Sequence, residues 1–153
     1  MTSVAETRVD VPRWLPPVAV GLVLAGLAVS GYLTYEHFTA STTLACPNTG
    51  ALNCAKVTSS QQSKLFGIPV AVLGLGYFLA ILAPVLPVAW RSADSRLRMG
   101  RLMAAGVGVC FVLYLVYAEL FLVNAICIWC TVVHVLTFVL FGVIAFGTAV
   151  TAR

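Results

Sequence analysis

The chain has 153 residues, of which 61% are hydrophobic and 9% carry a formal charge, and its mean hydropathy is +1.01. A soluble domain of this size could not bury so much apolar surface, so the composition excludes a soluble globular protein and predicts a multi-pass membrane protein. The net charge of +4 does not indicate a nucleic-acid partner, because the basic residues fall between apolar segments, where membrane topology requires them.

The apolar segments, taken in chain order, predict helices that cross the membrane, since one span takes about 20 apolar residues. The last apolar run, from Leu102 to Ala152, has Glu119 as its only formally charged residue. One helix of that length would measure about 75 Å, so the run is predicted to fold back once, at Asn124. The predicted spans are residues 18–35, 68–90, 102–123 and 126–150. We therefore expect an all-α integral membrane protein, a four-transmembrane-helix bundle in one domain over 18–150.

Lys and Arg residues predict the orientation, because they concentrate in cytoplasmic connections. The N-terminal segment 1–17 holds two arginines and the second connection holds four, whereas the first and third connections hold only Lys56 and Lys64. We therefore expect a protein of the cell inner or plasma membrane, with segment 1–17 and the tail 151–153 in the cytoplasm. Glu119, near the outer end of the third span, is expected at the membrane interface, and a proton role at the site is the alternative.

Two cysteine pairs fall on the predicted outer side, where disulfides persist. Cys46 and Cys54 lie in the longest polar loop, and Cys127 and Cys130 open the last span. A spacing of three places the last two sulfurs about one helical turn apart, close enough to bridge. The pattern suggests a relay that passes electrons between the pairs by disulfide exchange, whereas Cys110, deep in the third span, is expected to be a packing residue.

Two other interpretations of the cysteines remain open at this point. The four paired cysteines and His134 could supply zinc ligands, although the apolar spacer Ile128-Trp129 is more typical of a lipid boundary than of a zinc knuckle. Cys46 and Cys54 could instead form a static loop disulfide. Either interpretation would make the chain a structural or metal-binding membrane subunit.

The order of these motifs resembles the vitamin K epoxide reductase family, specifically its bacterial homologues, in a single-domain form without a fused thioredoxin-like domain. The matching stretches are Ser30-Gly-Tyr-Leu-Thr-Tyr35, Cys46-x7-Cys54-Ala-Lys-Val57-x-Ser59-Ser60, Phe66-Gly67-Ile-Pro69 with Gly74, and Cys127-Ile-Trp-Cys130. Together they span about residues 18–150. The resemblance implies an enzyme, a quinone-linked disulfide-forming oxidoreductase, whose four helices surround a menaquinone or ubiquinone near the outer surface.

The resemblance also implies an order of electron transfer. A separate DsbA-like, thioredoxin-like extracytoplasmic protein would attack the loop disulfide at Cys46. Cys54 would then attack Cys127, and Cys130 would pass two electrons to the quinone, in support of oxidative protein folding. A short helix over about 57–66 would lie on the membrane surface as a lid over the site.

Three further residues are candidates for contact with the quinone. The resemblance places Ser60 in the pocket wall. His134 follows Cys130 by four positions and shares its helical face, so its ring could donate a hydrogen bond to a quinone oxygen. Trp129 lies between the site cysteines, where it suits anchoring at the membrane boundary and could also form part of the pocket wall.

Two rival classes of membrane protein remain. A DsbB-type oxidase performs the same task on four helices, but its C-x-x-C pair precedes its second helix and its other pair lies in the last loop. The order is reversed in this chain. A small proton-coupled exporter typically carries a mid-membrane carboxylate, and Glu119 is predicted too near the surface for that task.

Overall fold

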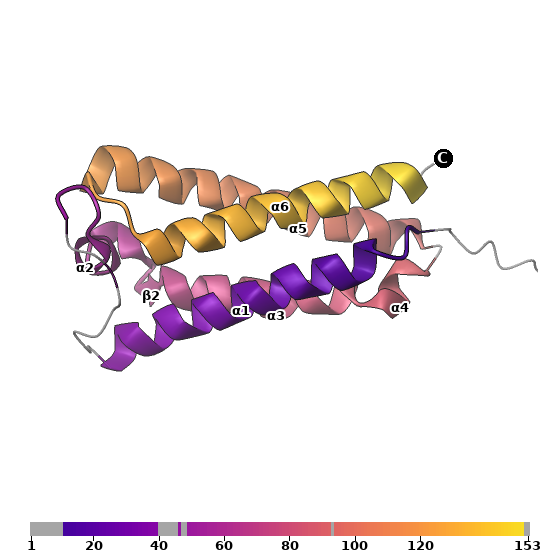
Figure 1. Cartoon of the computed structure of the whole chain (residues 1–153), viewed down its shortest axis with the longest axis horizontal. Coiled ribbons are helices and arrows are strands. Elements are labelled where there is room, and N and C mark those ends of the chain that lie inside the picture. Colours follow the sequence, from indigo (N-terminus) through magenta and orange to yellow (C-terminus); the bar gives the residue numbers. More distant parts are fainter. Residues whose placement is uncertain (1–10, 40–45, 47–48, 93, 152–153) are drawn as a thin grey trace, which may run out of the picture.

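The computed structural model describes residues 11–39, 46, 49–92 and 94–151, and helices make up most of this part of the chain. The long helices run side by side in an elongated bundle (Figure 1). They are α1 Leu15–Thr39, α3 Val70–Val85, α5 Ser95–Tyr117 and α6 Ile128–Thr151. α1 packs against α3 and α6, and α5 packs against α6, whereas α3 and α5 share the least extensive of these contacts. The architecture is that of an all-α membrane protein.

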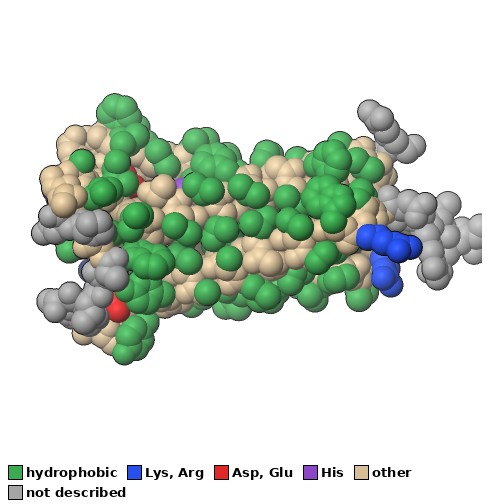
Figure 2. Space-filling view, viewed as in Figure 1, with side chains coloured by type: hydrophobic (Ala, Val, Ile, Leu, Met, Phe, Trp, Pro, Cys, Tyr) green, Lys and Arg blue, Asp and Glu red, His purple; other side chains and the backbone are tan. Residues whose placement is uncertain are grey.

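Within the part of the chain that the structure describes, three helical stretches are long and apolar enough to cross a membrane. They are α1, α6 and Ser95–Val123, which combines α5 with the six-residue π-helix η2 Ala118–Val123. α1 extends past the predicted span 18–35 at both ends, and α5 begins before the predicted 102–123. Large apolar side chains cover the outside of the bundle, as expected for a surface that faces lipid, and Lys and Arg gather at one end in this view (Figure 2).

The second predicted span, 68–90, is divided in the structure. α3 has 16 residues, with Pro84 in its last turn, and the chain is extended at Leu86. Pro87 then begins the short helix α4 Pro87–Trp90. Proline lacks an N–H and restricts the residue before it to extended conformations, so the two prolines account for the break.

The outer loop between α1 and α3 contains short elements in place of the single surface helix predicted over about 57–66. They are α2 Cys54–Thr58, the 3-10 helix η1 Gln61–Ser63, and the antiparallel strands β1 Lys64–Leu65 and β2 Ile68–Pro69. Phe66 and Gly67 join the strands with φ angles of 52° and 83°. Two consecutive residues with positive φ form a tight hairpin turn, which a helix cannot accommodate.

Glycines let aromatic side chains fill the core of the bundle. Phe78 on α3 is fully buried against Gly26 on α1, where a Cβ atom would overlap its ring. Trp90 on α4 packs against Gly147 on α6 in the same way, and the Arg101 guanidinium lies 3.4 Å from the Trp90 ring centroid. Small residues at such contacts bring helix backbones close together in lipid, where dispersion replaces the hydrophobic effect.

Candidate functional site

The outer loop is joined to the start of α6 by backbone hydrogen bonds. The Ile126 N–H donates to the Ala51 carbonyl at 2.9 Å, and the Asn53 N–H donates to the Ile126 carbonyl at 3.1 Å. This pairing brings Cys54 and Cys127, far apart in the sequence, into one buried cluster, in which they are 1% and 0% exposed. The shared cluster is the geometry that exchange between the two cysteine pairs requires.

The first cysteine pair is bonded in the structure. Cys46 and Cys54 form a disulfide, with their Cα atoms 6.1 Å apart. Cys54 is the first residue of α2, whose N-terminus is capped by the Asn53 side chain accepting from the Lys56 N–H at 2.9 Å. Cys46 is half-buried, whereas Cys54 is buried, so Cys46 is the more accessible member of the pair.

Cys127 caps the N-terminus of α6. Its carbonyl accepts the first helical hydrogen bond, from the Thr131 N–H, and its sulfur accepts from the Cys130 N–H at 3.3 Å. A hydrogen bond from the Cys130 thiol lowers the pKa of Cys127, and the backbone N–H groups act in the same direction, against burial and the charge of Glu119. A thiolate at a helix N-terminus is the nucleophilic form of a reactive cysteine. Cys127 and Cys130 are both free thiols in the structure.

Glu119 lies beside the second pair, in η2. The turn that follows η2 depends on Asn124, whose φ of 51° and ψ of 46° are left-handed, and the predicted reversal at this residue is confirmed. The Glu119 side chain is 7% exposed, and its carboxyl accepts a hydrogen bond from the Cys127 N–H. The structure therefore places Glu119 inside the protein at the cysteine site, and its interfacial depth in the membrane stays a prediction.

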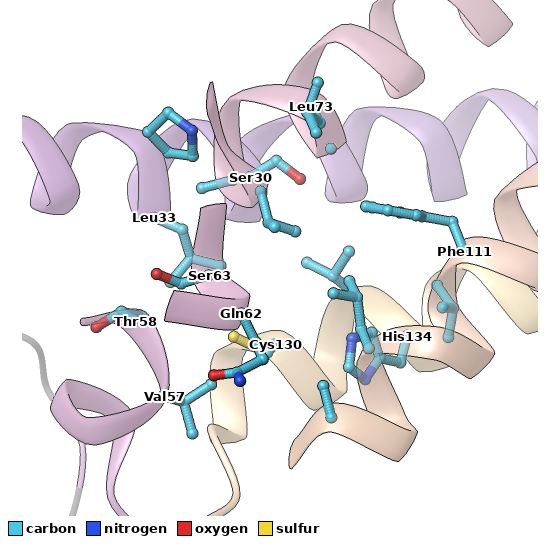
Figure 3. A pocket seen from close by; sticks show the side chains of 18 of the residues that line it. Ser30, Leu33, Val57, Thr58, Gln62, Ser63, Leu73, Phe111, Cys130 and His134 are labelled. Atoms are coloured by element: carbon cyan, nitrogen blue, oxygen red, sulfur yellow. The ribbon is translucent and has the colours of Figure 1, made fainter. Parts of the chain in front are cut away.

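A cavity of about 330 Å³ lies between the long helices, next to Cys130. Its wall is mostly apolar, a composition typical of small-molecule sites with a few placed polar groups. In Figure 3 the Cys130 and His134 side chains reach it from α6, across from Ser30 on α1. The side chains with polar atoms that line it are Ser30, His37, Thr58, Ser60, Gln62, Ser63, Tyr77, Glu119, Cys130, His134 and Thr137.

Two hydroxyl groups in this cavity lack partners among the described residues. They are the Ser30 Oγ and Tyr77 Oη atoms, both buried. Gly74 lies against the Ser30 hydroxyl, and Gly108 against that of Tyr77, so both hydroxyls lie at positions where a neighbouring helix carries no side chain. A buried hydroxyl without a hydrogen bond costs about 1–3 kcal/mol. Both residues line the cavity, so these two hydroxyls are candidate donors to a ligand with hydrogen-bond acceptors.

The candidate residues from the sequence divide between the cavity and its surroundings. Cys130, Ser60 and His134 line it, and the Ser60 hydroxyl donates to the Val57 carbonyl at 2.7 Å. Trp129 is not among the described lining residues; its ring packs 5.2 Å from that of Tyr32, centroid to centroid. The Trp129 ring therefore packs against α1, and its role in the pocket wall stays a prediction.

Sequence reasoning missed several of the cavity's polar groups, Ser30 and Tyr77 among them. Ser30 and Tyr77 both lie in predicted spans, where each buried hydroxyl needs a partner because lipid supplies none. Cys110, expected to be a packing residue, is free and exposed on the outside of the bundle. Among the residues that the structure describes, no three His, Cys, Asp or Glu side chains are grouped so that they could hold a metal ion.

A model of the vitamin K epoxide reductase family matches residues 17–145, most of the chain. The chain belongs to this family. Members of the vitamin K epoxide reductase family are membrane oxidoreductases that in general act with quinones and thioredoxin-like partners. Membership supports an enzymatic role for the cysteines, and the apolar helices agree with a membrane location.

Proposed function

We propose that this member of the vitamin K epoxide reductase family oxidises a separate thioredoxin-like protein and passes two electrons to a membrane quinone, which supports disulfide formation in secreted proteins. The observation that carries the proposal is the pairing of residues 51–53 with Ile126, which holds Cys54 and Cys127 in one buried cluster. A static loop disulfide would not need to lie against a second, free cysteine pair.

The relay proceeds by thiolate exchange through mixed disulfides. A partner thiolate attacks Cys46, the more accessible member of the loop disulfide, and Cys54 leaves as a thiolate. The released Cys54 attacks Cys127 when the latter is bonded to Cys130, and Cys130 leaves in turn. Cys130 then faces the cavity with the electrons. The partner departs oxidised when its second thiol attacks the bond to Cys46. The freed Cys46 thiolate then attacks Cys54, which breaks the Cys54–Cys127 bond, restores the loop disulfide and leaves Cys127 and Cys130 as the reduced pair.

The cavity suits a quinone head group. A quinone accepts two electrons and two protons, and it offers two carbonyl oxygens as hydrogen-bond acceptors. The unpartnered hydroxyls of Ser30 and Tyr77 are donors of the kind that these oxygens need. The surrounding apolar wall matches the ring, and an N–H of the His134 ring could donate a further hydrogen bond.

We further propose a topology of four spans with the cysteines on the outer side. Residues 70–90 of α3 and α4 would measure about 31 Å if continuous, enough to cross the hydrocarbon. The arginine-rich connection 91–101 lies at the end of the bundle opposite α2 (Figure 1). Basic residues favour the cytoplasmic side, which supports an outer location for the loop disulfide and for Cys127.

Quinone reduction by the purified protein in lipid nanodiscs tests the proposal, with a reduced DsbA-like protein as electron donor. We expect turnover in the wild type and in the Cys110→Ser control, and none in Cys130→Ser. Cys110 is the matched control because it is a free cysteine on the outside of the bundle. Turnover that persists in Cys130→Ser, or its absence from folded wild type with both quinone types, would contradict the proposal.

The order of the loop cysteines has its own test. Replacing Cys54 with serine leaves Cys46 without its internal partner, so a mixed disulfide with the donor protein should accumulate at Cys46. If the donor is captured only by the Cys46→Ser variant, the roles of the two cysteines are reversed.

A further inference from the structure

The Glu119 carboxyl lies between two cavities. It lines the large cavity next to Cys130, and it also lines a second cavity of about 210 Å³ at the same end of the bundle. The second cavity is bordered by the exposed residues Ala51, Leu120 and Asn124. Glu119 is therefore buried, yet it separates the large cavity from a space that opens toward solvent.

The carboxyl is held in this place by the local backbone. It accepts the Cys127 N–H, while the Glu119 carbonyl accepts the Ala125 N–H at 3.2 Å. The π-helix η2 and the left-handed Asn124 that ends it bring residues 119 and 127 together. π-helical turns occur often at functional sites, and a buried ionisable group at membrane depth indicates a function.

The proposed reaction needs a route for protons as well as electrons. Oxidising the Cys127–Cys130 dithiol removes two electrons and two protons. The quinone must receive the two electrons and also two protons to become a hydroquinone. Cys130 faces the large cavity and can release its own proton there, but Cys127 is fully buried and does not line that cavity. The proton of Cys127 therefore needs a carrier that reaches both Cys127 and the cavity.

We propose that Glu119 is this carrier. In the reduced enzyme the Glu119 carboxyl holds the proton that Cys127 gives up, and it passes this proton to a quinone oxygen as the Cys127–Cys130 disulfide forms. The two sulfurs supply two electrons, Glu119 and Cys130 supply one proton each, and the products are a disulfide, a hydroquinone and a Glu119 carboxylate. The inference rests on the proposed quinone reduction.

Glu119 is better placed to carry the Cys127 proton than the other titratable groups around it. Cys127 and Cys130 lie near it at the start of α6, and His134 of α6 lines the large cavity but not the second one. From α2, which packs against η2, the charged residue is Lys56, and it is exposed. Glu119 is therefore the described carboxyl that borders both cavities and contacts Cys127.

The test compares Glu119→Gln with the wild type in two separate half-reactions. Glutamine has nearly the same size and its amide oxygen can still accept the Cys127 N–H, but it carries no transferable proton. Oxidation of the donor protein by the loop disulfide, measured without quinone, should be unchanged. Oxidation of the pre-reduced Cys127–Cys130 pair by quinone should slow by roughly 10²- to 10⁴-fold. Formate, a small acid that fits the second cavity, should restore part of the rate.

Infrared difference spectra of reduced against oxidised protein, recorded without quinone, give a readout independent of turnover. Reduction should produce the signal of a newly protonated carboxyl in the wild type and in a Glu36→Gln control, and no such signal in Glu119→Gln. Glu36 is the matched control because it is a second buried carboxyl, 6% exposed, on α1 and outside the lining of the large cavity.

The outcomes separate the two proposals. Wild type that never reacts with quinone contradicts the proposed function itself. Wild type that reacts normally, with a Glu119→Gln variant of equal rate and an unchanged infrared signal, overturns the role of Glu119 and leaves the quinone reductase in place. A Glu119→Gln variant that fails to fold is replaced by Glu119→Asp, which should retain the infrared signal and part of the rate.

Discussion

Removing the Tyr77 hydroxyl should make the protein more stable and its quinone binding weaker. The hydroxyl is buried in the large cavity without a described partner, and such a group costs about 1–3 kcal/mol. In Tyr77→Phe this penalty disappears while the ring and its packing remain. If the hydroxyl donates to a quinone oxygen, the same substitution loses about 0.5–1.5 kcal/mol of binding, or roughly 2- to 13-fold in affinity.

Thermal unfolding of quinone-free protein in detergent, repeated with a titration of quinone, measures both effects. Tyr77→Phe should unfold at a higher temperature than wild type without quinone, and should gain less from added quinone. Thr137→Val is the matched control, because Thr137 lines the same cavity but its hydroxyl already donates to the Val133 carbonyl at 2.9 Å; it should lose stability. A Tyr77→Phe variant that loses stability and keeps its full response to quinone would refute the reasoning.

Two other predictions concern the bundle and the thiols. Gly26→Ala should destabilise the protein by about 1–3 kcal/mol, because the added Cβ would overlap the Phe78 ring. Gly21→Ala is the control and should not destabilise it, because nothing lies within 4 Å of a Cβ added there. Thermal unfolding of both variants checks this. Cys130→Ala removes the hydrogen bond that does most to lower the pKa of Cys127, so the pH at which Cys127 becomes reactive should rise. The pH dependence of its reaction with a small thiol-specific reagent measures the shift, and an unchanged or lower pH would contradict this cause.

Parts of the fold that depend on local chemistry could be predicted from the sequence. The reversal at Asn124 follows from the length of the last apolar run and from the tolerance of asparagine for left-handed backbone. The break after α3 had a local signal in Pro84 and Pro87 that hydropathy alone does not register. The Phe66-Gly67 pair likewise indicated a turn within the expected surface helix, since glycine adopts positive φ without strain.

Parts of the site that depend on distant contacts could not be predicted. The local sequence does not predict that Ile126 pairs with residues 51–53, because backbone hydrogen bonds between distant segments do not depend on a particular pattern of residues. The burial of Glu119 has the same origin, since it requires both the π-helical turn and the Cys127 N–H. His134 was predictable as a cavity residue because its i+4 spacing from Cys130 is a property of one helix.

The burial of the four cysteines affects which of them an outside thiol could reach in the proposed relay. Cys46 is half-buried, whereas Cys54 and Cys127 are 1% and 0% exposed, and Cys130 borders an apolar cavity. Of Cys46, Cys54 and Cys127, Cys46 is the one most open to a protein thiol from solution, and thiol–disulfide exchange depends on access to the sulfur. The steps that follow occur where water and stray thiols have little entry. An accessible Cys127 would exchange directly with the donor protein, so the pairing of residues 51–53 with Ile126 both joins the two cysteine pairs and shields Cys127.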